Sequence, residues 1–437
     1  MSLADVDGDG DLDLFVGGRV VPARYPEPAS SFLFLNDRGQ FKVDAGNFER
    51  FANVGLVSGS VFSDLDGDGD PDLALACEWG PVRVFRNDQG SFIEATAALG
   101  LAGYLGWWNG VTAGDLDGDG RLDLIASNWG LNTKYRATAE HPRRIYYGDF
   151  LGNGAVVPVE AFFDPFLQKE VPDRDLNIIG MALPFVRDQF ATHQSYAEAS
   201  LATVLGDLLK QARRVEANTL ASMAFLNRGD HFEARPLPGA AQFSPAFAVV
   251  VTDFDGDGRE DVFLSQNFVD AHPFTMPNDA GRGLWLRGNG QGGFEALLGA
   301  ETGVAVYGEQ RGAAVTDFDH DGRVDLVVTQ NGTQTKLYRN VGARPGIRVR
   351  LKGPPGNPFA VGATLRLKEG ERLGPAREIH AGSGYWSQDG PVQVLAAEMP
   401  PDGVWVRWPG GQTTSSRLPA GSRSVAIDTA GGVQAQP

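Results

Sequence analysis

An aspartate-rich nonapeptide with the pattern D-x-D-x-D-G-x-x-D occurs five times in this chain of 437 residues. Each copy places carboxylates at positions 1, 3, 5 and 9 and a glycine at position 6. Repetition of this kind predicts an array of similar structural units, each built around one copy. The copies are DVDGDGDLD from Asp5, DLDGDGDPD from Asp64, DLDGDGRLD from Asp115, DFDGDGRED from Asp253 and DFDHDGRVD from Asp317.

Short apolar segments rich in β-branched residues flank every copy. The segments VVVT before the copy at Asp253 and VFLS after it have no helical periodicity, which is typical of buried strands. A further strand often follows, as in VRVFRN and TKLYRN, and then a polar turn and a segment that begins with Phe. The sequence therefore predicts an all-β fold with about four strands per copy, the composition of a β-propeller blade.

A degenerate copy, DFLGNGAVV, begins at Asp149, and Leu151 and Val157 stand where two carboxylates are expected. Counting this copy, the sequence contains six visible blades. We expect its outer strands to come from MAFLNRGDHFEARPL, residues 223–237.

Two regions of the chain lack the repeat. Between about 172 and 217, apolar residues recur at helical spacing among charged ones, which predicts a helical insertion. After the last copy, segments such as IRVRLKG and GVWVRWPGG predict a small all-β domain. We therefore expect a propeller over residues 1–343, a second β domain over 344–430 and a frayed tail over 431–437.

The spacing of the nonapeptide suits an oxygen-only site for a hard divalent cation. Converging carboxylate oxygens and a glycine for a sharp turn are what Ca²⁺ requires. Position 7 varies between Asp and Arg, so a backbone carbonyl is the expected ligand there. An EF-hand opens with the same spacing but needs a Glu at position 12 and flanking helices, whereas position 12 is apolar in all five copies.

We predict about five structural calcium ions, one per loop. The alternative is that the aspartates only cap turns, but four carboxylates within nine residues would repel one another strongly without a cation. Affinities on the order of 10⁻⁴ to 10⁻³ M, as in extracellular modules, would leave the sites empty in the cytosol. The predicted ligands are Asp5, Asp7, Asp9, Asp13, Asp64, Asp66, Asp68, Asp72, Asp115, Asp117, Asp119, Asp123, Asp253, Asp255, Asp257, Asp261, Asp317, Asp319, Asp321 and Asp325.

The charge of the chain excludes one class of partner. Its formal net charge is −17, which argues against a nucleic-acid ligand because phosphate binding needs a basic surface. No apolar run approaches the roughly 18 residues of a membrane-spanning helix. The single cysteine, Cys77, permits no intrachain disulfide.

The nonapeptides and their flanking strands resemble FG-GAP/VCBS repeats from Leu3 to Val341. The C-terminal region resembles an ASPIC/UnbV domain in the segments VGATLRLKEG, REIHAGSGYWSQD and VWVRWPGGQ. The resemblance implies a calcium-binding protein of the extracellular space, cell surface or periplasm, with a role in adhesion or recognition. It also implies about seven blades. No signal peptide is visible and the chain opens inside a predicted strand, so we expect a truncated N-terminus.

In this resemblance the calcium loops share one face of the propeller, and the remaining loops share the opposite face. Aromatic, amide and charged residues of that opposite face suit a glycan or a protein ligand. The alternative is that the tryptophans pack between blades and the amides bind backbone. The candidate ligand-binding residues are Trp79, Trp107, Trp108, Asn109, Trp129, Tyr307, Arg311 and Asn331.

The sequence thus favours a binding module and not an enzyme. A polysaccharide lyase on a calcium-bearing propeller is the alternative, and it would need a base beside a substrate carboxylate. Tyr307 and Arg311 are the candidates for that role. A third hypothesis is a structural segment of a larger surface assembly.

Overall fold

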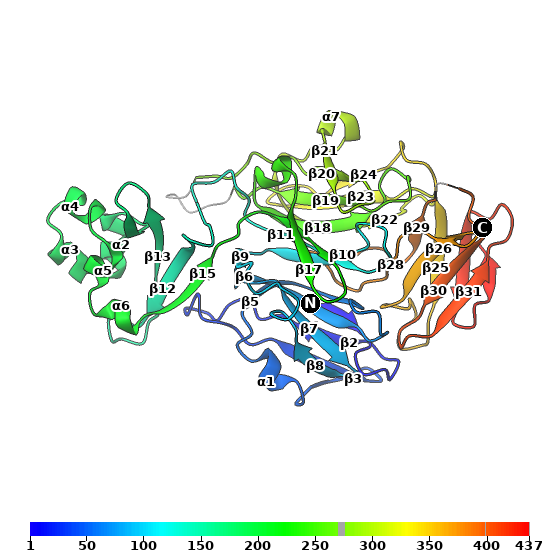
Figure 1. The fold of residues 1–437 in the computed structure, drawn as a ribbon, viewed down its shortest axis with the longest axis horizontal. Coiled ribbons are helices and arrows are strands. Elements are labelled where there is room, and N and C mark those ends of the chain that lie inside the picture. The colour runs from blue at the N-terminus through cyan, green and yellow to red at the C-terminus, as the bar shows by residue number, and fades with distance from the viewer. Residues whose placement is uncertain (270–275, 398, 437) are drawn as a thin grey trace.

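The computed structural model describes residues 1–269, 276–397 and 399–436. Within these ranges strands dominate and only short helices occur, so the predicted all-β class is confirmed. Figure 1 shows three parts along the longest axis of the molecule. A group of β-sheets forms the middle, a strand-and-helix unit projects at one end, and the C-terminal strands lie at the other.

Five antiparallel sheets contain the five nonapeptides, and each nonapeptide connects the first strand of its sheet to the second. Sheet 1 consists of β1 (Ser2–Ala4), β2 (Asp13–Val16), β3 (Phe32–Asp37) and β4 (Gln40–Val43). Sheet 2 consists of β5 (Leu56–Ser63), β6 (Asp72–Gly80), β7 (Arg83–Asp88) and β8 (Ser91–Glu94), with β9 (Gly106–Trp107) paired to β6.

The other three sheets repeat this order. Sheet 3 consists of β10 (Gly110–Gly114), β11 (Asp123–Ser127), β16 (Met223–Asn227) and β17 (Phe232–Pro236). Sheet 4 consists of β18 (Ala246–Thr252), β19 (Asp261–Gln266), β20 (Leu284–Gly288) and β21 (Phe294–Leu297). Sheet 5 has three strands, β22 (Glu309–Thr316), β23 (Asp325–Asn331) and β24 (Lys336–Tyr338).

The first strands of successive sheets lie next to one another, β1 beside β5, β5 beside β10, β10 beside β18 and β18 beside β22. The second strands run back beside them, and the later strands lie farther out (Figure 1). Apolar residues of neighbouring sheets pack together, so that Phe62 and Phe92 of sheet 2 join Phe15 of sheet 1 in one core. We call β1, β5, β10, β18 and β22 the inner strands.

The predicted sixth blade is wrong. The degenerate copy at Asp149 forms the turn between β12 (Arg143–Gly148) and β13 (Val157–Asp164), which belong to a separate sheet. Residues 223–237 do not extend that sheet, because β16 pairs with β11 and β17 pairs with β16. They complete sheet 3, whose two halves are separated in sequence by the inserted segment.

The inserted segment is a small unit with its own core. Its sheet has the strand order β14 (Lys169–Pro172), β13, β12 and β15 (Arg213–Ala217). The helices within the region predicted as a helical insertion pack on this sheet through Leu201, Val204 and Val159. These helices are α2 (Leu176–Ala182), α3 (Phe185–Gln189), α4 (His193–Ala197), α5 (Leu201–Leu205) and α6 (Leu208–Gln211).

The C-terminal domain contains two sheets around a common core that includes Val349, Leu365 and Trp408. The first has the order β29 (Gln393–Leu395), β25 (Ile347–Lys352), β32 (Ser424–Asp428) and β33 (Val433–Ala435). The second has β27 (Arg372–Leu373), β26 (Thr364–Glu369), β30 (Gly403–Arg407) and β31 (Thr413–Arg417), with β28 (Arg377–Glu378) paired to β26.

The expected frayed tail is also corrected. β33 pairs antiparallel with β32, and the Gln436 amide donates to the Ser424 carbonyl at 2.8 Å. Three short elements complete the described structure, namely α1 (Phe48–Phe51), a 3₁₀ turn at Gly239–Gln242 and α7 (Gly299–Thr302). Among the described residues, no helix is long and apolar enough to cross a membrane.

Residues 376–390 of the C-terminal domain, here the central segment, run along the inner strands. The Leu3 amide of β1 donates to the Ala381 carbonyl at 2.8 Å, and the Gly384 amide donates to the Val111 carbonyl of β10 at 2.8 Å. At β22, the Gly390 amide donates to the Val315 carbonyl at 2.8 Å.

The central segment also lies against β5 and β18, at a distance that only glycine permits. A Cβ on Gly59 of β5 would lie 2.6 Å from the Gly384 carbonyl oxygen, and one on Gly384 would lie 2.6 Å from the Val249 carbonyl oxygen. Real Cβ atoms are not found so close to backbone atoms. All five inner strands therefore contact one stretch of the C-terminal domain.

Candidate metal centres and the face opposite them

The five aspartate loops share one hydrogen-bonding scheme. The glycine at position 6 has a φ between 82° and 101° in every copy, the left-handed region that glycine enters without a steric penalty. Its amide donates to Oδ2 of the position 1 aspartate at 2.8–3.1 Å. The predicted sharp turn is therefore present in all five loops.

The position 9 aspartates begin the second strand of each sheet and are buried. One carboxylate oxygen accepts the amide of position 2, as from Leu116 to Asp123 at 2.8 Å. The other accepts an amide at the end of the third strand, as from Asn227 to Asp123 at 2.7 Å. The same pair of bonds occurs in the other four loops. Position 9 therefore ties the loop to two strands.

Three carboxylates come together in each loop, with one oxygen from each lying within 4.8 Å of the others. Several of these oxygens are buried without a hydrogen-bond partner among the described residues, including Oδ1 of Asp5, Asp115 and Asp117. Such oxygens are costly to bury unless a cation compensates them. The sets are Asp5, Asp7 and Asp13; Asp64, Asp66 and Asp68; Asp115, Asp117 and Asp123; Asp253, Asp255 and Asp261; and Asp317, Asp319 and Asp325.

Most aspartates of position 5 lie outside these sets, although the sequence predicts them as ligands. In every loop the position 5 Oδ1 accepts the amide of position 7, at 2.8–3.0 Å. In the loops at Asp115, Asp253 and Asp317, the Arg at position 7 also forms an ion pair with it. The degenerate loop at Asp149 has the amide bonds but is not among the clustered carboxylates.

Burial has a large effect on carboxyl groups at position 9, one of which, Asp72, lies outside the three-carboxylate set of its loop. It raises the pKa of Asp13 to about 7 and the pKa of Asp72, Asp123 and Asp261 to about 8. A nearby divalent cation favours the ionised form and opposes this shift. An all-oxygen donor set with buried, poorly compensated carboxylates fits Ca²⁺.

The C-terminal domain covers the face that carries these loops. Nη2 of Arg407 lies 2.8 Å from Oδ2 of Asp64, and Nε of Arg348 lies 2.7 Å from Oδ2 of Asp317. The Ala376 amide donates to Asp115 at 2.8 Å. These contacts could not be inferred from the sequence, because each joins residues far apart in the chain.

The two remaining loops also touch this domain. The Arg344 amide donates to the Asp255 carbonyl at 3.1 Å, and Gly356 packs so closely on Asp11 that a Cβ would lie 2.0 Å from its carboxylate. The face predicted to bind calcium is therefore also the docking face of the C-terminal domain.

A buried ion pair lies in the centre of this interface. Arg377 donates to Oε1 of Glu260 from Nη2 at 2.6 Å and from Nε at 3.0 Å, and both side chains are almost fully buried. Glu260 occupies position 8 of its loop, where the other copies have Leu12, Pro71, Leu122 and Val324. In the sequence, the available indication of this ion pair was an acidic residue at a position that is apolar in the other four copies.

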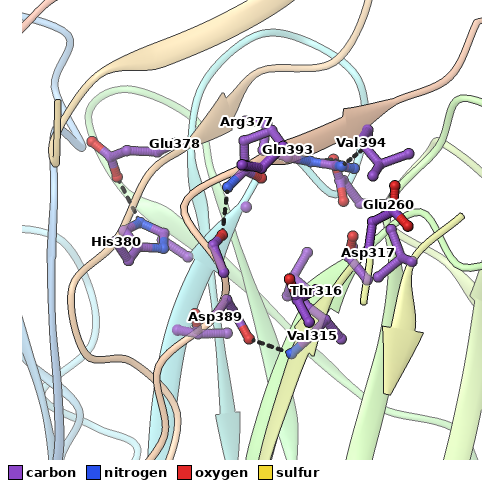
Figure 2. Close-up of a pocket in the computed structure, with 18 of the residues that line it drawn as sticks. Glu260, Val315, Thr316, Asp317, Arg377, Glu378, His380, Asp389, Gln393 and Val394 are labelled. Atoms are coloured by element: carbon purple, nitrogen blue, oxygen red, sulfur yellow. Dashed lines mark hydrogen bonds and ion pairs between the residues drawn. The ribbon is translucent and has the colours of Figure 1, made fainter. Parts of the chain in front are cut away.

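Figure 2 shows the small polar cavity around this pair. Nε2 of His380 lies 2.8 Å from Glu378, and the Val315 amide donates to Asp389 at 2.9 Å. Burial raises the pKa of Asp389 to about 6. The cavity has a volume of about 40 Å³, which holds water molecules but no organic substrate. The surroundings of His380 therefore indicate a structural role for this side chain.

The candidate ligand-binding residues divide between the core and the opposite face. Trp107 and Trp129 stack with ring centroids 4.2 Å apart and an interplanar angle of 11°. Trp79 packs on Trp107 at 5.1 Å and its Nε1 donates to Tyr25 at 2.6 Å. Of the three tryptophans, Trp79 and Trp129 are buried and Trp107 is half-buried. Of the stack, Trp107 alone retains more than slight solvent exposure.

Trp108 and Asn109 are corrections to the predicted site. Trp108 is fully buried in the core shared by sheets 2 and 3, and Nδ2 of Asn109 donates to the Ala246 carbonyl at 2.8 Å. Side chains without exposed surface cannot contact a ligand, so both have the packing role that was the alternative interpretation.

Tyr307 and Asn331 are exposed, as a ligand face requires. Tyr307 is 67% exposed and the Arg282 guanidinium lies 5.2 Å from its ring centroid. The Arg311 guanidinium packs 4.1 Å above the Phe247 ring and forms an ion pair with Glu309. Trp386, which is not among the predicted ligand-binding residues, is 76% exposed.

Comparison with known proteins supports this architecture. Residues 64–126, which contain the loops at Asp64 and Asp115, match the FG-GAP-like repeat, and residues 353–434 match the family described as ASPIC and UnbV. One segment of the chain is thus similar to an FG-GAP-like repeat, and another is similar to ASPIC and UnbV proteins. The UnbV match coincides with the C-terminal domain and extends into β33.

Cartilage acidic protein 1 is a curated relative of this chain. The Mus musculus protein is 27% identical over 65% of this chain and 38% of its own length, and the Homo sapiens protein is 27% identical over 62% and 36%. The chain therefore spans little more than a third of the length of these relatives.

Solved structures that are similar to this chain superpose on it with low TM-scores. Rhamnogalacturonan lyase YesW has a TM-score of 0.30 at 13% identity, covering 100% of this chain and 66% of its own. The V. cholerae biofilm matrix protein Bap1 has a TM-score of 0.26 at 10% identity, covering 97% and 64%.

Proposed function

We propose that sheets 1 to 5 are the blades of a calcium-bearing β-propeller that acts as a recognition module outside the cytoplasm. The observation that carries the proposal is the repetition of one loop geometry five times, with three carboxylate oxygens gathered in each loop. Calcium neutralises these carboxylates and fixes the connection between the two inner strands of each blade. The ions are structural in this proposal.

The C-terminal domain supports the choice of ligand face. Because it packs on all five aspartate loops, the loop ends on the opposite side of the sheets are the surface left for a partner. Tyr307, Asn331 and the half-buried Trp107 lie there. Aromatic rings beside amides and arginines suit a glycan or a protein surface.

Metal analysis tests the calcium sites. We expect about five Ca²⁺ per chain at millimolar calcium, with affinities on the order of 10⁻⁴ to 10⁻³ M. The double change Asp115→Asn and Asp117→Asn should remove one ion. Asp149→Asn in the degenerate loop is the matched control and should remove none. Equal calcium content in all three proteins, or no bound calcium in the wild type, would contradict the proposal.

Ligand screening tests the recognition role. We expect a glycan or protein ligand whose binding is weakened by Tyr307→Ala, since this side chain is exposed and its loss leaves the core intact. Phe166→Ala, on the 95% exposed Phe166 of the inserted unit, is the control. A ligand that binds both variants equally well would place its site elsewhere.

We also propose that the module binds and does not catalyse. A lyase would need Tyr307 and Arg311 free to act on a uronate, and Arg311 is held against Phe247 and Glu309. Incubation with uronate polymers should therefore give no new absorbance from unsaturated products. Appearance of that absorbance, and its loss in Tyr307→Phe, would establish the enzymatic alternative.

A further inference from the structure

The central segment contains two stacked aromatic residues, Tyr385 and Trp386, where it runs along the inner strands. Tyr385 is buried against Phe247, with ring centroids 5.3 Å apart. Trp386 stacks on Tyr385 at 4.7 Å with an interplanar angle of 14°. Because Trp386 is 76% exposed, one face of its indole is covered by Tyr385 and the other is open to solvent.

The backbone holds Trp386 in an unusual conformation. Its φ is 52°, a region that bulky residues rarely adopt without support from their surroundings. That support comes from hydrogen bonds on both sides, where Ser383 donates to the Ser387 carbonyl at 3.2 Å and the Ala313 amide donates to Oγ of Ser387 at 3.0 Å. These hydrogen bonds fix the turn on the inner strands and leave Trp386 exposed to solvent.

A cavity of about 620 Å³ lies beside this tryptophan. Its volume falls in the range of roughly 300–1,000 Å³ that is typical of ligand pockets. Sheets 1 and 2 form one wall and the central segment forms the other. The lining residues on which the argument depends are Trp386, Gln388, Arg19, Ser60, Gly59 and Gly382.

Two polar side chains of the wall retain hydrogen-bonding capacity. Arg19 uses Nη1 on Oε2 of Glu78 at 2.5 Å, and its other nitrogens have no partner among the described residues. The exposed amide of Gln388 also has no protein partner within the described part of the chain. Donors and an acceptor therefore lie around the open face of an indole ring.

We propose that this cavity is a saccharide-binding site, formed jointly by the C-terminal domain and sheets 1 and 2. The apolar face of a pyranose ring stacks on Trp386, and its hydroxyl groups bond with Arg19 and Gln388. A flat ring with hydroxyls at its rim matches this combination of one exposed indole and peripheral polar groups. The inference rests on the proposed recognition role and names the ligand class and a residue of the site.

Titration calorimetry of the whole chain in millimolar calcium tests the site, with a cello-oligosaccharide as the neutral probe and an oligogalacturonate as the carboxylated one. We expect at least one probe to bind, and Trp386→Ala to weaken it by roughly tenfold or more. Trp386→Phe should retain part of the affinity, because it keeps an aromatic face. Arg19→Gln should weaken the oligogalacturonate more than the cello-oligosaccharide if the arginine meets a carboxylate.

Thermal melting of each variant confirms that it is folded, and Phe166→Ala is the control for loss of an exposed aromatic ring. Absence of binding by both probes to the folded wild type overturns the inference. Binding that Trp386→Ala leaves unchanged also overturns it, while the proposed recognition function stands. Self-association that Trp386→Ala abolishes, without saccharide binding, would instead identify a protein-binding surface.

Discussion

Nη2 of Arg407 lies 2.8 Å from Oδ2 of Asp64, the first aspartate of the second loop. The guanidinium comes from the C-terminal domain, and the carboxylate is one of three that are placed to hold a cation. One carboxylate therefore serves both the proposed metal and the docking of the neighbouring domain. Arg348 and Asp317 repeat this relationship in the fifth loop.

Arg407→Gln should affect docking and calcium in opposite directions. Loss of the charged contact should lower the free energy of unfolding of the calcium-free protein by about 1–2 kcal/mol. Removal of a positive charge beside Asp64 should at the same time strengthen calcium binding at that loop. Differential scanning fluorimetry and calcium titration measure the two effects. Arg417→Gln, on an exposed residue of β31, is the control, and weaker calcium binding in Arg407→Gln would refute the shared role.

Arg377→Met should be strongly destabilising, because it leaves the buried Glu260 carboxylate without its cation. Breaking such a pair costs about 3–5 kcal/mol. The double change Arg377→Met and Glu260→Leu should recover much of this loss, because it removes both buried charges. Urea unfolding of the two proteins tests the coupling. Equal stability of the single and double variants would mean that the two side chains are energetically independent.

The stabilisation by calcium should grow with pH. Burial raises the pKa of Asp72, Asp123 and Asp261 from 3.8 to about 8. A raised folded-state pKa means that, without metal, these groups contribute stability below the unfolded value and lose it as the pH rises through the folded value. Calcium replaces the protons, so the gain in Tm on adding calcium should be small near pH 5 and largest near pH 8, about the pKa of these groups. Asp72→Asn should reduce the pH dependence, and a gain that is constant over this range would contradict the explanation.

Trp108→Ala and Tyr307→Ala should differ in their effect on stability, because Trp108 packs in the core and Tyr307 lies on the surface. Trp108 is fully buried, so its truncation should cost about 3–5 kcal/mol. Tyr307→Ala should leave Tm nearly unchanged, since exposed substitutions have small effects on stability. Thermal melts of both proteins make the comparison. A stable Trp108→Ala protein would contradict its position in the core.

The local features of this fold could be predicted from the sequence, and the long-range ones could not. The aspartate spacing and its flanking apolar segments indicated the turn and two strands in each copy, because these depend on neighbouring residues. The partner of MAFLN could not be inferred, because β16 follows an inserted unit and still pairs with β11. No local pattern encodes such a pairing.

The candidate site shows the same division. Trp107 and Trp108 are adjacent and chemically identical, yet one is half-buried in the aromatic stack and the other is fully buried. Alternation of side chains along an extended backbone would have predicted that the two face opposite sides. Trp386 lay outside the predicted face because it belongs to another domain. Its location depends on the path of the central segment.

The bond between Leu3 and Ala381 has a consequence for biosynthesis. Ala381 is synthesised after β1 and after all five aspartate loops, so this bond and its cover of the β1 edge cannot form until the C-terminal domain has left the ribosome. Exposed strand edges promote aggregation. Nascent chains that are released before the central segment emerges should therefore depend on chaperones far more than the finished protein does.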